Sequence, residues 1–282
     1  MGVLAIMPSA LRPGHRTITA FLDGPDSLDI RNIIHSSEGA AQYGYKGPLV
    51  GGVTVYGWAI PAVLQTLGET WLESGWADVA FRKPVYPGDE MTVDVVPTGD
   101  TTAALEMKNQ DGAVCLSANL GMGTPGFASD YVLPSRRMAE PEPVDRPQLT
   151  MESAPVGSDL RPMAVPYTLP DARAYASDKQ RDPDPRWSEP GGRIHPGWLA
   201  AQMTPLIHHS YNYGPAIHAR SQIQNLRPAL LGQTVTVAGH FLQAYERKGH
   251  HYGVVDGVIL GADGSELCYV RHTTIFEVAK RG

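Results

Sequence analysis

Two short glycine-rich segments hold residues whose types could do chemistry, and they follow the same pattern. Residues 47–52 read Gly-Pro-Leu-Val-Gly-Gly and residues 192–197 read Gly-Arg-Ile-His-Pro-Gly, and each opens a long apolar stretch. Glycine at a helix start permits close approach to the backbone, and the helix N-terminus adds positive potential. His35 lies upstream of the first segment and His195 lies within the second. Because imidazole exchanges a proton near neutral pH, these residue types allow proton transfer beside a helix start.

The two segments belong to a longer repeat. Gly47 and Gly192 are 145 residues apart, and so are Gly52 and Gly197. An offset of 144 residues joins three further pairs, which are Pro61 and Pro205, Pro84 and Pro228, and Gly88 and Gly232. A near-constant offset through two copies of one pattern indicates a duplicated unit. We therefore predict an N-terminal repeat over residues 1–122, a proline-rich linker over 123–160 and a C-terminal repeat over 161–282.

The elements that must position these residues follow from hydrophobic periodicity. Apolar residues at three- and four-residue spacing over 53–74 predict a helix with one buried face, which Pro61 is expected to bend. The other predicted elements of the first unit are a strand over 15–22, a short helix over 37–43 and strands over 77–82, 91–96, 101–108 and 114–122. Those of the second are a strand within 162–175, a polar loop over 176–191, a helix over 198–211 and strands over 234–246, 250–260 and 267–278. One long helix with several antiparallel strands in each unit predicts an α+β fold with the sheet wrapped on the helix.

Composition and charge argue against several classes of function. The formal net charge is −6 at pH 7 and no dense Lys/Arg cluster is present, so no nucleic-acid partner is expected. No run of about 18 apolar residues occurs, so no membrane span is predicted. Cys115 and Cys268 fall at equivalent positions of the two units, where a disulfide is not expected, and reduced thiols predict a cytoplasmic protein. The remaining histidines lack the spacing of metal ligands, so neither a metal nor a cofactor is predicted.

The order of these segments resembles the MaoC-like (R)-specific enoyl-CoA hydratase and dehydratase family in its double hot dog form. That family's signature runs Asp-x-Asn-Pro-aliphatic-His, then an acidic residue, then Gly-aliphatic-aliphatic-His-Gly at the start of the central helix. Asn32-Ile33-Ile34-His35, Glu38 and residues 47–52 follow it in order, with Gly51 at the place of the later histidine. Residues 82–89 resemble the family's strand turn. Residues 192–197 repeat the glycine-rich sequence that precedes the central helix. The resemblance covers most of residues 15–122 and 163–278.

The resemblance implies a lyase that reversibly hydrates a 2-enoyl thioester or dehydrates a 3-hydroxyacyl thioester of CoA or an acyl carrier, in fatty-acid or polyketide metabolism. In that family an aspartate and a histidine share one water, and a backbone N–H at the helix start binds the thioester oxygen. By resemblance His35 is the acid–base group, with Asp29 or Asp178 as its partner because the signature aspartate falls on Ile30. The residues expected around the substrate are Asn32, which should also order its loop, Tyr43, Gly51, Gly52, His195 and Gly197.

Two other functions stay open on the same fold. A thioesterase would use a carboxylate such as Glu38 or Asp178 to activate water at the thioester carbonyl. A degenerate hot dog protein would bind an acyl chain or a partner subunit without catalysis, and the displaced aspartate favours this alternative. Association of the chain into a homodimer is open as well.

Overall fold

The computed structural model describes residues 11–279, so residues 1–10 and 280–282 of the two predicted repeats lie outside it. The first unit contains β1 (Gly14–Thr19), η1 (Ile33–His35), α1 (Ser37–Gln42), α2 (Gly52–Leu67), α3 (Trp71–Ser74), β2 (Gly75–Phe81), β3 (Glu90–Pro97), β4 (Thr102–Lys108) and β5 (Val114–Met122). The segment between the units holds η2 (Gly126–Asp130) and β6 (Ser158–Asp159). The second unit contains β7 (Met163–Tyr167), α4 (Leu169–Ala174), η3 (Tyr175–Gln180), η4 (Pro185–Trp187), α5 (Pro196–Ala201), α6 (Met203–Ser210), β8 (Ile217–Asn225), β9 (Gln233–Arg247), β10 (His250–Leu260) and β11 (Glu266–Glu277).

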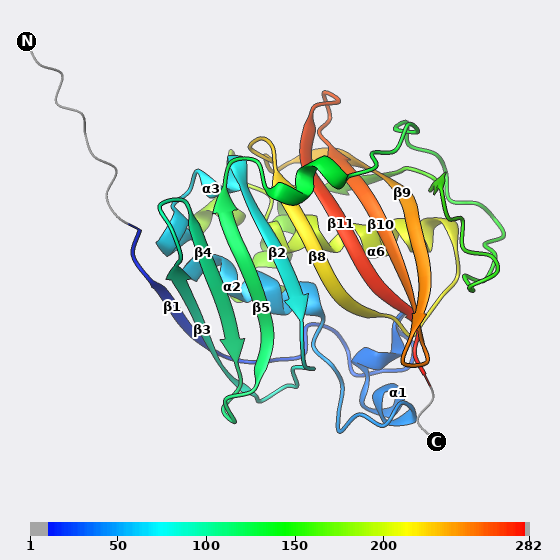
Figure 1. The fold of residues 1–282 in the computed structure, drawn as a ribbon, viewed down its shortest axis with the longest axis horizontal. Helices are drawn as coiled ribbons and strands as arrows, with labels where there is room; N and C mark the ends of the chain where they lie inside the picture. The colour runs from blue at the N-terminus through cyan, green and yellow to red at the C-terminus, as the bar shows by residue number, and fades with distance from the viewer. Residues whose placement is uncertain (1–10, 280–282) are drawn as a thin grey trace, which may run out of the picture.

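These strands form one antiparallel sheet that both units share. Its order is β1-β3-β4-β5-β2-β8-β11-β10-β9-β6, with β7 paired to β9. Figure 1 shows the sheet as a curved layer with α2 and α6 behind it. The β2–β8 pair joins the two units, because Trp76 to Ala80 run alongside Gln224 to Arg220. The predicted α+β class is therefore confirmed.

Helix α2 is buried on almost every side, which explains its apolar sequence. Trp58, Ala59 and Ile60 are fully buried in consecutive positions, so this helix lies largely within the core, with Gln65 as an exposed residue near its end. It ends at Gly68, whose φ of +76° is left-handed and favours glycine. The helix predicted over 53–74 is thus two helices, α2 and α3, and Pro61 lies inside α2 without ending it.

The helix predicted over 198–211 is also divided in the structure. Helix α5 ends at Ala201, and α6 begins at Met203 after Gln202. Pro205 lies in the first turn of α6, where its missing N–H removes no intrahelical hydrogen bond. The proline therefore favours a new helix start, so one continuous rod does not form.

Strand β8 was not predicted, although it lies in the middle of the sheet. Its sequence, Ile-His-Ala-Arg-Ser-Gln-Ile-Gln-Asn, is mostly polar and does not follow the alternation of a half-buried strand. Gln222 and Gln224 are nevertheless buried. Tyr131, from the segment between the units, donates its hydroxyl to the carbonyl oxygen of Gln222 at 2.9 Å. Polar residues thus occupy both faces of a strand that the linker covers, and periodicity alone does not find it.

The predicted polar loop over 176–191 is partly helical. It contains most of η3 and all of η4, and Trp187 within it is 2% exposed. The indole N–H of Trp187 donates to Asp182 at 3.0 Å, so the polar residues here support a buried aromatic ring. Segment η3 also packs against α2, the helix whose start lies at the candidate site.

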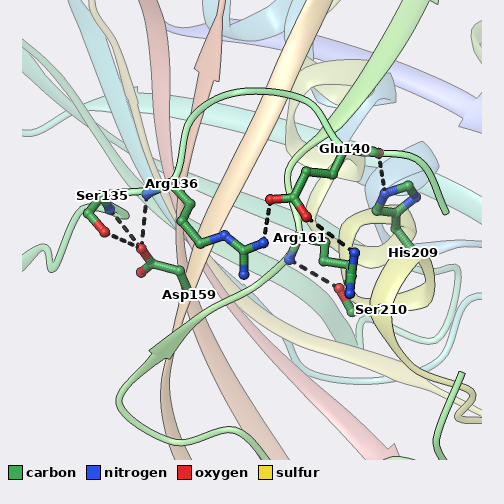
Figure 2. A network of polar contacts seen from close by, with 7 residues as sticks. All are labelled: Ser135, Arg136, Glu140, Asp159, Arg161, His209 and Ser210. Carbon is green, nitrogen blue, oxygen red and sulfur yellow. Dashed lines mark hydrogen bonds and ion pairs between the residues drawn. The ribbon is translucent and has the colours of Figure 1, made fainter. Parts of the chain in front are cut away.

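Polar contacts within the linker, and from the linker to Arg161 at the start of the second unit, hold the proline-rich segment in place (Figure 2). The Asp159 carboxylate accepts hydrogen bonds from the N–H and hydroxyl of Ser135, at 2.9 and 2.7 Å, and from the N–H of Arg136 at 3.0 Å. The Glu140 carboxylate pairs with Arg136 and Arg161. The proline-rich segment is therefore held at two neighbouring anchors, one of them on the edge strand β6.

The anchor at Asp159 should make the stability of the protein depend on acid. Burial alone raises the pKa of this carboxyl, but the hydrogen bonds from Ser135, His240 and Arg136 outweigh it and lower the pKa from 3.8 to about 2. A lowered folded-state pKa stabilises the fold above pH 4 or so and loses that contribution as the pH falls towards 2. We expect Asp159→Asn to reduce the free energy of unfolding by about 2 kcal/mol at neutral pH.

Urea unfolding of wild type and Asp159→Asn at neutral pH and at about pH 3 measures this effect. The difference in free energy of unfolding between wild type and Asp159→Asn should shrink at the lower pH, because the wild-type carboxyl then becomes protonated and stabilises the fold less. A difference that is independent of pH would contradict the assignment.

Candidate active site

A cavity of about 520 Å³ lies between the two units beside the start of α2. Its wall combines the η1 segment and the first turn of α2 with residues of α6 and the ends of β8, β10 and β11. Leu49, Val55 and Ile217 are among its apolar lining residues. We call it the His35 cavity, after the histidine of the predicted signature that lines it. Because both units supply the wall, neither unit forms this site alone.

The His35 ring makes a contact through each of its nitrogens. Its Nδ1 lies 2.7 Å from the carbonyl oxygen of Leu49. A carbonyl oxygen can only accept, so Nδ1 carries the proton of the neutral ring. Nε2 then accepts a hydrogen bond from the side-chain amide of Asn32 at 3.2 Å. Nε2 is therefore the nitrogen of His35 that can take up a proton in the cavity.

Asn32 holds the histidine segment against the second unit. Its amide nitrogen donates to the carbonyl oxygen of Ala216 at 2.8 Å, and its side-chain oxygen accepts from the N–H of Ala216 at 3.1 Å. Ala216 directly precedes β8. Asn32 thus fixes the loop that carries His35, and its remaining amide hydrogen faces the imidazole.

The start of α2 brings backbone N–H groups to the same cavity. Gly51 is the N-cap residue and supplies no side-chain hydrogen bond to the first turn. Gly51 and Gly52 both line the cavity. A Cβ on Gly52 would lie 3.1 Å from ring carbons of Phe81 and 3.4 Å from Cβ of His218, so the backbone fits closely between them. Asp23, which sequence analysis missed, lies at this helix start and accepts a hydrogen bond from the hydroxyl of Thr54.

Five predicted site residues lie outside the cavity, and two of them, His195 and Gly197, are described below. Asp29 is exposed, and its backbone N–H donates to the hydroxyl of Ser27 at 3.1 Å. Asp178 is exposed and accepts a hydrogen bond from Ser177 at 2.5 Å. Tyr43 is partly buried at the end of α1, away from the lining residues. The cavity instead brings together Asn32, His35, Gly51 and Gly52, and no Asp or Glu within the described chain lines it.

Solved structures share this fold over nearly the whole chain. A protein described as a MaoC domain dehydratase from Chloroflexus aurantiacus matches with a TM-score of 0.63 and 15% identity, covering 97% of this chain and 96% of that one. A Mycobacterium tuberculosis protein described as a double hot dog matches with a TM-score of 0.61 and 15% identity, covering 95% and 96%. The chain has the double hot dog fold. A protein described as an oleoyl thioesterase from Lactobacillus plantarum matches this double hot dog with a TM-score of 0.50 and 11% identity, covering 97% and 99%.

The resemblance predicted from the sequence is thus confirmed at the level of the fold. No protein-family model matches the sequence, and no curated protein matches it. The double hot dog fold comprises the central helices α2, α5 and α6 and the shared sheet, and the chemistry depends on the residues of this chain.

In the second predicted repeat, a buried glutamine stands 145 residues after His35. At an offset of 145 residues, Gln180 corresponds to His35. Gln180 is 1% exposed, and its amide nitrogen lies 3.2 Å from the hydroxyl of Tyr175. A Cβ on Gly57 would lie 2.3 Å from Oε1 of Gln180, so the glutamine fills the space beside α2. The residue at this offset is therefore an amide and not an imidazole.

His195 and Gly197, both predicted near the substrate, are buried where α5 crosses α2. Nδ1 of His195 accepts a hydrogen bond from the N–H of Gly197 at 3.1 Å and caps α5. Burial disfavours the charged ring and, with the nearby positive charge of Arg16, lowers the pKa of His195 to about 3. A Cβ on Gly197 would lie 3.1 Å from Cα of Gly57. The structure thus gives these residues a packing role away from the His35 cavity.

Sequence analysis did not identify His218 as a cavity residue, because β8 was not recognised. Its Nε2 lies 2.8 Å from the hydroxyl of Ser221 and 3.1 Å from Nδ1 of His272. Burial and the adjacent His272 lower the pKa of His218 well below its ordinary value. The His218 ring therefore lines the cavity as a neutral group whose Nε2 is already in contact with Ser221 and His272.

Within residues 11–279, no group of three or more His, Cys, Asp or Glu side chains could hold a metal ion. None of the helices in that range is long and apolar enough to cross a bilayer.

Proposed function

We propose that the protein is an acyl-thioester hydratase or dehydratase in which His35 transfers the proton. The observation that carries this proposal is the orientation of one imidazole. Nδ1 donates a hydrogen bond to the Leu49 carbonyl, so Nε2, which the Asn32 amide contacts at 3.2 Å, is the basic nitrogen, and the cavity also contains the N-terminus of α2. Base and oxyanion donors are the two requirements for adding water to a conjugated thioester.

In the hydration direction, Nε2 of His35 takes a proton from water as the water oxygen bonds to C3 of the enoyl group. The electron pair of the double bond moves towards the thioester oxygen, and backbone N–H groups at the start of α2 stabilise that negative charge. The imidazolium then delivers its proton to C2, which restores neutral His35 and yields the 3-hydroxyacyl thioester. Dehydration is the reverse sequence.

The chemical nature of the wall supports an acyl substrate. Leu49, Val55 and Ile217 line the space next to His35, and aliphatic walls suit an acyl chain. Two solved structures of the same fold are described as a MaoC-like dehydratase and a MaoC domain dehydratase, which supports a hydratase or dehydratase function. The carrier would be CoA or an acyl carrier protein.

A second candidate function is acyl binding without catalysis. The observation that favours it is that neither Asp29 nor Asp178 lies beside His35, while the resembled family uses an aspartate and a histidine together. The thioesterase alternative receives less support, because Glu38 and Asp178 are exposed and do not line the cavity.

One assay panel separates these functions. The protein is incubated with crotonyl-CoA and longer enoyl-CoAs, while enoyl absorbance and free thiol are followed together. Loss of enoyl absorbance without thiol release supports the hydratase, and thiol release supports the thioesterase. Saturable binding without either change would replace the hydratase proposal with the acyl-binding function.

A further inference from the structure

A polar groove of about 640 Å³ lies on the outer face of the sheet, across the junction of the two units. Its lining comes from β2, β4, β5, β8, β9, β10 and β11, and we call it the outer groove. Phe81, Arg82, Ala219 and Tyr252 line both this groove and the His35 cavity. The two spaces therefore meet at these residues, so one extended molecule could occupy both.

Two arginines give the outer groove positive charge that the protein does not neutralise. Nε of Arg82 donates to the hydroxyl of Ser117 at 3.0 Å, a neutral partner. Arg247 is exposed, and its guanidinium makes no hydrogen bond or ion pair within residues 11–279. Such guanidinium groups bind phosphate oxygens well because their donors form a planar fork.

The acidic residues of the groove are already paired. Asp78 accepts from Arg220 at 2.8 and 2.5 Å. Glu106 pairs with Lys108 at 2.7 Å. Arg82 and Arg247 therefore remain as a local excess of positive charge on a chain whose formal net charge is −6. This local reversal of sign favours an anionic ligand.

A pair of aromatic rings lies in the same groove. Tyr245 on β9 and Tyr252 on β10 are partners in the strand register. Their ring centroids are 4.9 Å apart and their planes differ by 2°. Both side chains are only partly buried. Flat aromatic groups beside arginines form a surface on which a nucleobase can stack.

We propose that the outer groove binds the nucleotide end of coenzyme A, a phosphorylated adenosine, while the thioester lies in the His35 cavity. This inference rests on the proposed function and selects CoA as the acyl carrier. The phosphate groups contact Arg82 and Arg247, and the adenine stacks beside Tyr245 or Tyr252. An acyl carrier protein offers a phosphodiester but no base on its prosthetic arm, so it would leave the aromatic pair unused.

Calorimetric titration with adenosine 3′,5′-bisphosphate tests the groove without any turnover. Wild type should bind this probe, and Arg247→Ala should bind it about tenfold more weakly, the loss expected for one charge-assisted contact. Tyr245→Ala should weaken binding to a similar degree if the base stacks there. Arg227→Ala is the matched control, because Arg227 is also exposed but does not line the groove. Absence of binding at millimolar probe, or equal affinity in wild type and Arg247→Ala, overturns the proposal.

A kinetic comparison connects the groove to the reaction. Arg247→Ala should raise KM for an enoyl-CoA about tenfold and leave KM for the matching enoyl-pantetheine unchanged, because only CoA carries the nucleotide. Faster turnover of a carrier-protein thioester than of the CoA thioester would overturn the choice of CoA. Binding of the bisphosphate by a protein that hydrates no enoyl thioester would support the groove and remove the hydratase, so the two proposals fail separately.

Discussion

His35→Ala is expected to lower the rate of enoyl-thioester hydration by about 10²- to 10⁴-fold, the usual contribution of a positioned acid–base group. The variant removes the only nitrogen that we assign to proton transfer, since Asp29 and Asp178 lie outside the cavity. The measurement is kcat and kcat/KM with crotonyl-CoA, followed by loss of enoyl absorbance. Both parameters should fall together, because the group acts in the transition state and contributes little to ground-state binding.

The matched control is His209→Ala. His209 lies on α6 outside the cavity, where its Nε2 contacts the carbonyl oxygen of Glu140 at 3.0 Å (Figure 2). It removes an imidazole of the same size, so unchanged kcat in this variant attributes the effect to the position of His35. Full hydratase activity in a folded His35→Ala protein would remove His35 from the mechanism.

Much of the architecture could be predicted because repeated local signals agree. The turn at Asp111-Gly112 lies between β4 and β5, and the turn at Asp263-Gly264 lies between β10 and β11, as hairpin chemistry predicts. Both Gly112 and Gly264 have positive φ, which explains why glycine stands there. Such turns depend on a few neighbouring residues, so a single sequence is sufficient to find them.

The composition of the site depends on contacts that are distant in the sequence. Asn32 and Ala216 are 184 residues apart, yet their hydrogen bonds fix the loop that carries His35. No local sequence pattern predicts that contact, because the sequence of β8 lacks the alternation of a half-buried strand. The sequence therefore identified His35 and the glycines at the start of α2, while the opposite wall, including His218, required the fold.

The two aspartates show a different limit of sequence reasoning. Asp29 is one residue from the signature position, and a shift of one residue can turn a side chain from a cavity towards solvent. The predicted partner Asp178 precedes Gln180, which is buried against α2, but itself faces solvent. Residue type and spacing made both carboxylates candidates, but the backbone path decides which way each side chain points, and both are exposed outside the cavity.

Arg271→Leu is expected to reduce the free energy of unfolding by about 3–5 kcal/mol, the cost of leaving a buried charge without its partner. The carboxylate of Asp256 on β10 is 0% exposed. It accepts two hydrogen bonds from Arg271 on β11, at 2.6 and 2.7 Å, and one from the N–H of Val132 at 2.8 Å. Arg271 also donates to the carbonyl oxygen of Asp130 at 2.6 Å, so the pair joins the sheet to the linker. Urea unfolding at neutral pH measures the loss.

Two further variants establish that the uncompensated charge causes this loss. Arg173→Leu is the control, because Arg173 and Glu189 are both more than half exposed and 3.8 Å apart, and such pairs contribute about 0–1 kcal/mol. The double variant Asp256→Leu with Arg271→Leu should recover much of the stability, since apolar groups can replace a buried ion pair without leaving a bare carboxylate. If Arg271→Leu destabilises no more than Arg173→Leu, the pair does not anchor the linker, and contacts such as that of Tyr131 with Gln222 must hold it.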